Sequence, residues 1–136
     1  MSQDTLGSRS KCVTVARAAL SAGKRVVIDR TNFDSKQRAT WVHLAHNCWP
    51  ACDQTFTITP HICVVRFDTT RELCVQRCKA NRNHPTLAPT DANRVIGYME
   101  RDWVEPTLNE GVDAVVRIAN GDTKFYEEVV ARLNCV

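Results

Sequence analysis

Apolar side chains recur at helical spacing in several stretches of the chain, and residues that begin or end helices flank these stretches. Ser8 or Ser10 can cap a helix that continues to about Ala22, because a serine oxygen accepts a hydrogen bond from a free amide of the first turn. Gly23 then ends this helix. Its apolar face consists of Cys12, Val13, Ala16, Ala19 and Leu20.

A second helix is expected to open at Phe33 and Asp34 and to end before Pro50. Asp34 and Gln37 stand three residues apart at its start, which is the spacing of a capping box. Cap signals and helical spacing predict three further helices, over residues 72–81, 91–103 and 124–133.

Three short apolar runs rich in β-branched residues lie between these helices and predict strands. They cover residues 25–28, 62–67 and 114–118. A continuously apolar run is typical of a strand that is buried on both faces. Strands that alternate with helices predict an α/β fold, a parallel sheet with helices on both faces. Three strands are few for so many helices, which suggests that part of the sheet is missing.

The composition fits one domain, residues 1–136, with 43% hydrophobic residues and a net charge of +3. We expect neither a membrane span nor a signal peptide, and therefore a nuclear or cytoplasmic protein. The charge is uneven along the chain. Residues 66–94 hold six cationic side chains and only three acidic ones, and we call this set the 66–94 basic segment; its cations are Arg66, Arg71, Arg77, Lys79, Arg82 and Arg94.

The seven cysteines do not predict a metal site or a disulfide framework. Their number is odd, and the pairs Cys48/Cys52 and Cys74/Cys78 have helical spacing rather than the Cys-x-x-Cys of a zinc ribbon. We therefore interpret most of the cysteines as small apolar residues of the interior.

Two acidic residues stand where an apolar or strand-like segment gives way to turn-forming residues. Asp4 lies in Gln-Asp-Thr-Leu-Gly-Ser, residues 3–8, and Asp29 follows the run Val-Val-Ile at residues 26–28. Open α/β sheets place their chemistry at the carboxyl ends of their strands. The Gly-x-x-x-x-Gly-Lys-Ser/Thr loop that usually accompanies such acids is not found in the sequence.

At these residues the chain resembles the kinase domain of polynucleotide 5′-hydroxyl kinases, the P-loop kinase half of polynucleotide kinase/phosphatase. Four pieces carry the resemblance in the family's order, and together they run through most of the chain. They are residues 3–8, 23–32, 77–82 and 105–111. The resemblance implies a P-loop kinase-like fold, ATP and Mg²⁺ as cofactors, and the 5′-OH ends of nucleic acids as substrates in DNA or RNA repair.

The resemblance also implies roles for single residues. Asp4 matches the catalytic aspartate that accepts the proton of the attacking 5′-hydroxyl. Asp29 matches the acid that holds the Mg²⁺ shell, with Asn32 beside it as a nucleotide-binding residue. Three cationic residues match the lid: Arg77 and Arg82 as catalytic residues that stabilise charge on the transferred phosphoryl group, and Lys79 as a competing candidate for the nucleotide.

The chain departs from the family at its start, because Met1 stands just before the Gln-Asp-Thr-Leu-Gly piece. The family's first strand and P-loop precede this piece, and the strand would lie centrally, between the strands at Val26 and Ile62. Its loss would remove on the order of 5–10 kcal/mol of apolar burial. We therefore expect an N-terminally truncated domain that is inactive in isolation.

Other interpretations stay open. The chain could be a non-catalytic remnant that binds nucleic acid or a protein partner through the 66–94 basic segment, or a kinase of small-molecule hydroxyls. Asp29 also fits a cap of the following turn, and the three lid cations fit a solvated helix face.

Overall fold

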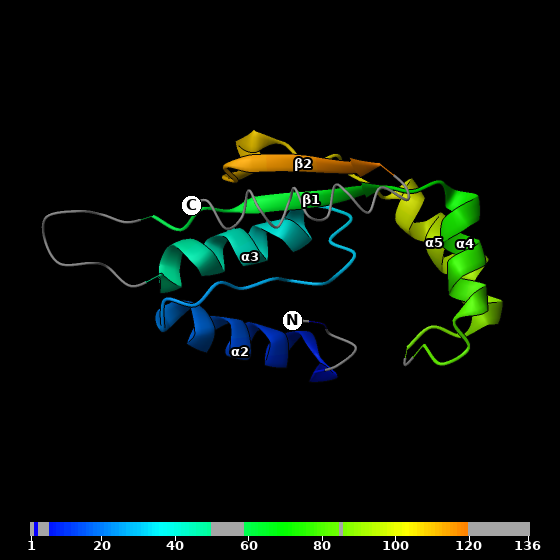
Figure 1. The fold of residues 1–136 in the computed structure, drawn as a ribbon, viewed down its shortest axis with the longest axis horizontal. Helices are drawn as coiled ribbons and strands as arrows, with labels where there is room; N and C mark the ends of the chain where they lie inside the picture. The colour runs from blue at the N-terminus through cyan, green and yellow to red at the C-terminus, as the bar shows by residue number, and fades with distance from the viewer. Residues whose placement is uncertain (1, 3–5, 50–58, 85, 120–136) are drawn as a thin grey trace, which may run out of the picture.

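The computed structural model describes residues 2, 6–49, 59–84 and 86–119, which form a small sheet flanked by helices (Figure 1). In chain order the elements are α2 (Arg9–Ser21), α3 (Ser35–Cys48), β1 (Cys63–Asp68), α4 (Arg71–Ala80), η1 (Pro89–Asp91), α5 (Ala92–Arg101), η2 (Leu108–Glu110) and β2 (Ala114–Ala119). The helix expected over residues 124–133 lies outside the described residues.

The sheet consists of β1 and β2, which pair in parallel from Cys63 opposite Ala114 to Asp68 opposite Ala119. The residues before the two strands are also paired, because the Ile62 carbonyl accepts a hydrogen bond from the Asp113 amide at 2.8 Å. In Figure 1 α3 lies beneath the sheet and α2 beneath α3, while α4 and α5 lie side by side beyond the end of the strands. The predicted α/β fold with a parallel sheet is confirmed, and both of these strands begin and end within a residue of their predicted bounds.

The prediction of a strand over residues 25–28 is wrong. The described part of this segment is extended but forms no regular strand, and its nearest pairing is a single parallel bridge between Ser2 and Asp29. Val26 and Ile28 pack against the core, whereas Val27 is 71% exposed. The apolar run is therefore half-buried rather than buried on both faces, and the described residues contain two strands instead of three.

The helix starts follow the local sequence. The Ser8 hydroxyl caps α2, the Thr70 hydroxyl caps α4, and the Asp34 carboxylate accepts from the Gln37 amide at 2.7 Å to cap α3. The Gln37 side chain donates to the other oxygen of Asp34 at 3.1 Å. The cap predicted at Asp34 is confirmed.

The core lies between α2 and α3. Ala16, Leu20 and Leu44 are buried there, and Val26, Ile28 and Trp41 pack around them. Cys12 is buried on the same face of α2, as its spacing predicts. None of the described helices is both long and apolar enough to cross a membrane.

Gly111 ends η2 in the left-handed region, with φ +80°, close to α3. A Cβ at this position would lie 3.3 Å from the Val42 side chain, which is buried. We expect Gly111→Ala to lower the free energy of unfolding by about 1–2 kcal/mol from the backbone conformation, and further through this contact. Denaturant unfolding measures the loss.

The matched control is Gly23→Ala, because Gly23 also has a positive φ, +66°, but has nothing within 4 Å of its Cβ position. It reports the cost of the left-handed conformation alone. An equal loss of stability in the two variants would show that Val42 does not resist the added methyl group.

Candidate functional site

The segment that carries Asp29 runs in the same direction as β1. In Figure 1 it passes between α2 and α3 and turns at the side of the molecule where β1 ends and where α4 and α5 lie. Asp29 is exposed, and its backbone forms the parallel bridge with Ser2. An exposed carboxylate thus stands at the end of an extended segment, the position that the sequence predicts for a metal-binding acid.

The turn that follows is fixed at Asn32. Its φ of +42° lies in the left-handed region, which asparagine tolerates better than most residues. Arg38 donates to the Asn32 carbonyl at 2.9 Å, and the Trp41 indole donates to its side-chain oxygen at 3.1 Å. The guanidinium of Arg30 lies 5.9 Å from the centre of the Trp41 ring. Two side chains of α3 thus hold the turn, one at its backbone and one at the Asn32 side chain.

Arg38 is itself held by Glu110. Its side chain is 4% exposed, and its guanidinium donates to both carboxylate oxygens, at 2.7 and 2.8 Å. Such a bidentate pair fixes geometry as well as charge. The hydrogen bond from Arg38 lowers the pKa of Glu110, although its own burial opposes this shift. We call Asn32, Arg38, Trp41 and Glu110 the turn clamp.

A second ionic cluster surrounds Glu105 at the sheet. One of its carboxylate oxygens accepts from Arg66 at 2.8 Å and from Arg117 at 2.7 Å, and the other accepts from Trp103 at 3.2 Å. Arg66 and Arg117 are opposite each other in the strand register, so Glu105 offsets the repulsion between them. Burial would raise the pKa of Glu105, but these hydrogen bonds and the nearby Arg66 lower it.

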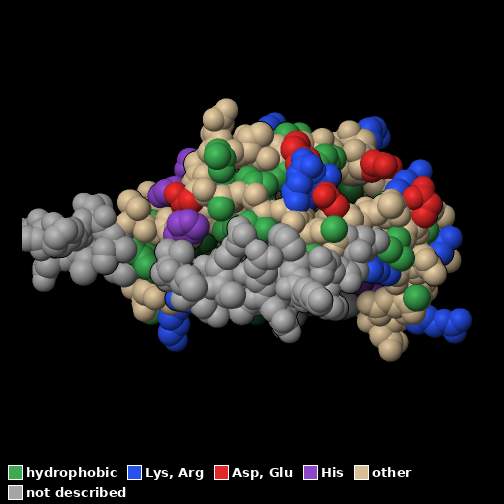
Figure 2. Space-filling model, turned by 45° about the horizontal axis from the view of Figure 1, so that its top comes forward, with side chains coloured by type: hydrophobic (Ala, Val, Ile, Leu, Met, Phe, Trp, Pro, Cys, Tyr) green, Lys and Arg blue, Asp and Glu red, His purple; other side chains and the backbone are tan. Residues whose placement is uncertain are grey.

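Three of the six cations of the 66–94 basic segment form ion pairs. Arg66 pairs with Asp68 and Glu105, Arg71 with Glu100, and Arg94 with Asp91. Figure 2 shows acidic and basic side chains next to one another on this part of the surface. Two of these partners, Glu100 and Glu105, come from outside the segment. The positive charge of Arg66, Arg71 and Arg94 is thus locally offset in the fold.

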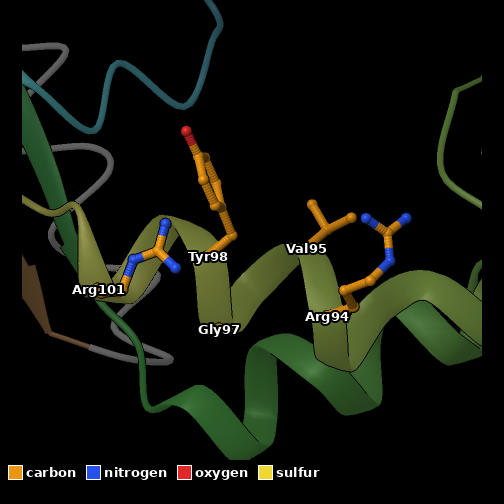
Figure 3. A pocket seen from close by; sticks show the side chains of 5 residues that line it. All are labelled: Arg94, Val95, Gly97, Tyr98 and Arg101. Atoms are coloured by element: carbon orange, nitrogen blue, oxygen red, sulfur yellow. The ribbon is translucent and has the colours of Figure 1, made fainter.

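Helix α5 connects to the Asp29 segment through Phe33. The rings of Phe33 and Tyr98 meet nearly at right angles, 81°, with 6.1 Å between their centres. The Val104 amide, just after α5, donates to the Phe33 carbonyl at 2.8 Å. An open cavity of about 440 Å³ lies on α5 beside this contact (Figure 3); it is lined by Arg94, Val95, Gly97, Tyr98 and Arg101.

The three predicted lid cations lie at the end of α4. Arg77 and Lys79 are in its last turn and Arg82 follows it, and all three side chains are exposed. Helix α4 packs against α5, which in turn reaches the Asp29 segment. Asp4, the predicted catalytic base, lies outside the described residues. The structure brings Asp29 and Asn32 together in one turn, and their roles stay predictions.

The sequence does not mark three residues that the structure places in or beside the site: Arg38, Glu110 and Tyr98. Glu110 lies in the piece 105–111 that the resemblance singled out, and this was its one signal in the sequence. Arg38 stands in a helix whose other polar residues are mostly solvated or capping, so its spacing does not mark it. Tyr98 belongs to no motif that the sequence analysis singled out.

The described cysteines and metal-ligating side chains bear on two further chemistries, that of a thiolate nucleophile and that of a metal site. The five described cysteines are free, and burial raises the pKa of the Cys63 thiol and, together with Cys78, that of Cys74. A raised thiol pKa disfavours the nucleophilic thiolate. Among the described residues no three histidine, cysteine or acidic side chains gather as a metal site.

Comparison with protein families identifies one match that covers most of this architecture. The sequence model of the family AAA_33, described as an AAA domain, matches residues 3–106, more than half of the chain. The matched region contains α2 to α5, the Asp29 turn and all of the predicted site residues.

Proposed function

Since the chain belongs to the AAA domain family AAA_33, a P-loop NTPase-like kinase family that includes polynucleotide kinase, we propose that it is a polynucleotide 5′-hydroxyl kinase domain. It takes part in transferring the γ-phosphate of ATP to the 5′-OH end of a nucleic acid. The transfer would serve DNA or RNA repair. The more specific assignment within the family rests on the four sequence pieces at residues 3–8, 23–32, 77–82 and 105–111.

One observation carries the proposal. Asp29 presents an exposed carboxylate at the end of an extended segment, directly before a turn that the clamp holds in a left-handed conformation. Phosphoryl transfer depends mainly on positioning and on stabilising charge. The clamp fixes the backbone that directly follows the carboxylate, so less backbone freedom is lost when a ligand binds, which favours this chemistry.

The donor set fits Mg²⁺. This ion keeps several of its waters and is usually held by one or two protein carboxylates together with substrate phosphates. Asp29 supplies a carboxylate, and Asn32 is next to it in the turn, although Trp41 already engages its side-chain oxygen. When bound, Mg²⁺ supplies neutralisation of charge on the ATP phosphates. A dedicated cluster of three protein ligands is not required for such a role.

The chain's own residues would supply the general base and the lid cations. The oxygen of the 5′-hydroxyl attacks the γ-phosphorus of ATP, and Asp4 accepts the proton of this hydroxyl. The bond from the γ-phosphorus to the β–γ bridging oxygen breaks, and ADP is released. Arg77, Arg82 and Lys79 stand on the element that would supply positive charge to the transferred group, as the resemblance implies. Arginine suits phosphate because its planar guanidinium presents several donors.

The test measures transfer of labelled γ-phosphate from ATP to a 5′-OH oligonucleotide. Two proteins are compared: the chain of 136 residues, and the same chain joined to an upstream strand and Gly-Lys-Ser/Thr loop, which we call the P-loop fusion. We expect transfer by the P-loop fusion and none by the 136-residue chain. An oligonucleotide already phosphorylated at its 5′ end is the control and accepts no label.

Two outcomes would overturn the proposal. Equal or better transfer by the P-loop fusion to small alcohols would assign it to small-molecule hydroxyl kinases. Salt-sensitive oligonucleotide binding without transfer to any hydroxyl would assign the chain to a non-catalytic binding role.

A further inference from the structure

The cavity on α5 lies beside the predicted site but contains none of the residues to which the family resemblance gives a role, although Arg94 belongs to the 66–94 basic segment. It is open, with Val95, Gly97 and Tyr98 between an arginine at each end (Figure 3). Arg94 and Arg101 are seven residues apart in one helix, which places them two turns, or about 10 Å, from each other along its axis. The helix thus presents an aromatic ring between two cations.

Tyr98 is arranged as a platform. Its side chain stands away from the helix and is 52% exposed. Phe33 packs against the ring, and the guanidinium of Arg101 lies 4.8 Å from its centre. These contacts restrict the ring before any ligand binds, so that stacking on it costs little further order. In Figure 3 Val95 and Arg94 lie on the other side of Tyr98 from Arg101, so the ring borders the cavity.

Both arginines have donors left for a ligand. Arg94 gives one hydrogen bond to Asp91, at 3.0 Å, and Arg101 gives two to Asp102, at 2.9 and 3.2 Å. A guanidinium carries five N–H donors. The single exposed pair of Arg94 with Asp91 is of the kind that contributes little to stability, whereas Arg101 holds Asp102 through two hydrogen bonds. A phosphate can therefore bind Arg94 in place of or beside Asp91, and it can bind Arg101 through the donors that Asp102 leaves free.

We propose that this face of α5 binds a single-stranded nucleic acid, with a base stacked on Tyr98 and backbone phosphates on Arg94 and Arg101. Cations along a groove with an aromatic ring between them are the features by which proteins hold single strands. An open cavity suits a strand that continues past it at both ends. Phe33, which packs on Tyr98, is four residues from Asp29, so a strand bound here approaches the Asp29 turn.

This inference rests on the proposed function and names the surface that holds the substrate strand. The test measures the affinity of the full chain for a 3′-labelled 5′-OH oligothymidylate by fluorescence anisotropy, without ATP. Tyr98→Leu keeps the apolar contact with Phe33 and removes the stacking face, and we expect it to weaken binding about tenfold. Tyr98→Phe keeps the ring and is expected to bind like the wild type.

Arg94→Gln tests the phosphate contact. We expect weaker binding and a salt dependence whose logarithmic slope falls by about 0.7, the value for one phosphate contact on a single strand. The matched control is Arg17→Gln, because Arg17 is an exposed arginine on α2. It is expected to leave both quantities unchanged.

The outcomes separate this inference from the proposed function. Binding by the wild type together with equal binding by Tyr98→Leu would overturn the α5 surface and leave the kinase proposal standing. Absence of oligonucleotide binding by the wild type would also overturn the α5 surface, whereas the kinase proposal is decided separately by transfer with the P-loop fusion. Displacement of the oligonucleotide by AMP at the same nucleotide concentration would show that the cavity takes a mononucleotide instead of a strand.

Discussion

Replacing Glu110 by glutamine is expected to lower the free energy of unfolding by about 3 kcal/mol. The change leaves the guanidinium of Arg38, which is 4% exposed, without its opposite charge. Glu110 is 15% exposed, and glutamine can still accept one hydrogen bond, so the loss falls at the lower end of the range for broken buried pairs. Urea unfolding followed by far-ultraviolet circular dichroism measures it.

The double variant Arg38→Met with Glu110→Leu is the control, since it removes both charges and leaves apolar side chains in their place. Replacing a whole buried pair in this way is often neutral or stabilising. We expect its stability to be closer to the wild type than that of Glu110→Gln. A Glu110→Gln variant within about 0.5 kcal/mol of the wild type, the range of ordinary surface substitutions, would show that the pair is not buried in solution.

The same pair predicts a dependence on pH. Because Arg38 lowers the pKa of Glu110 in the folded chain, the carboxylate contributes stability that is complete above the ordinary glutamate pKa of about 4.3. This contribution is lost as the pH falls through the lower pKa of the folded state. The difference in stability between the wild type and Glu110→Gln is therefore expected to be constant near neutral pH and to shrink in acid.

Features set by a few neighbouring residues could be predicted from the sequence. The caps at Ser8 and Asp34 need only a side-chain oxygen and the amides of the next turn. The strands at residues 63–68 and 114–119 are compact β-branched runs whose pairing partner is in the chain. Local chemistry and available partners agree at these places, and the predictions succeed.

The prediction fails over residues 25–28 because a strand is defined by its neighbours. The run has strand composition, but among the described residues regular pairing is confined to β1 and β2, and Val27 stays exposed. The turn clamp could not be predicted for a related reason. Arg38 and Glu110 are 72 residues apart in sequence, and only the fold brings them together. Their contact depends on packing that no local pattern encodes.

The local charge of the 66–94 basic segment also depends on contacts that are distant in sequence. A count over residues 66–94 shows an excess of cations, but the ion pairs of Arg66 and Arg71 are made with Glu105 and Glu100 from later in the chain. The binding surface proposed on α5 could not be predicted from the sequence either. Tyr98 and Arg101 belong to no sequence motif, and Arg94 is one cation among six in the 66–94 basic segment; they become a candidate site only because they line one cavity beside Phe33.

Alanine at position 4 is expected to lower the kcat of the P-loop fusion by about 10²–10⁴-fold, the contribution of a general base. The loss should persist at saturating Mg²⁺ and leave the KM for the oligonucleotide little changed, because the base acts on the hydroxyl proton rather than on binding. Steady-state transfer to a 5′-OH oligonucleotide measures both constants. Thermal unfolding of the variant checks that the domain is intact. Undiminished transfer would remove the role given to Asp4.

Asp29→Asn is expected to differ from Asp4→Ala in its response to metal. Asparagine keeps the size of the side chain and removes its charge, so the Mg²⁺ concentration for half-maximal transfer should rise, and added Mg²⁺ should restore part of the rate. Asp29 is exposed, so this change is expected to cost little stability, and a lost rate reports chemistry rather than unfolding. The control is Glu72→Gln, an exposed acid in the first turn of α4. If Asp29→Asn kept the wild-type Mg²⁺ dependence while Asp4→Ala was inactive, Asp29 would be a turn residue and the metal would be held elsewhere.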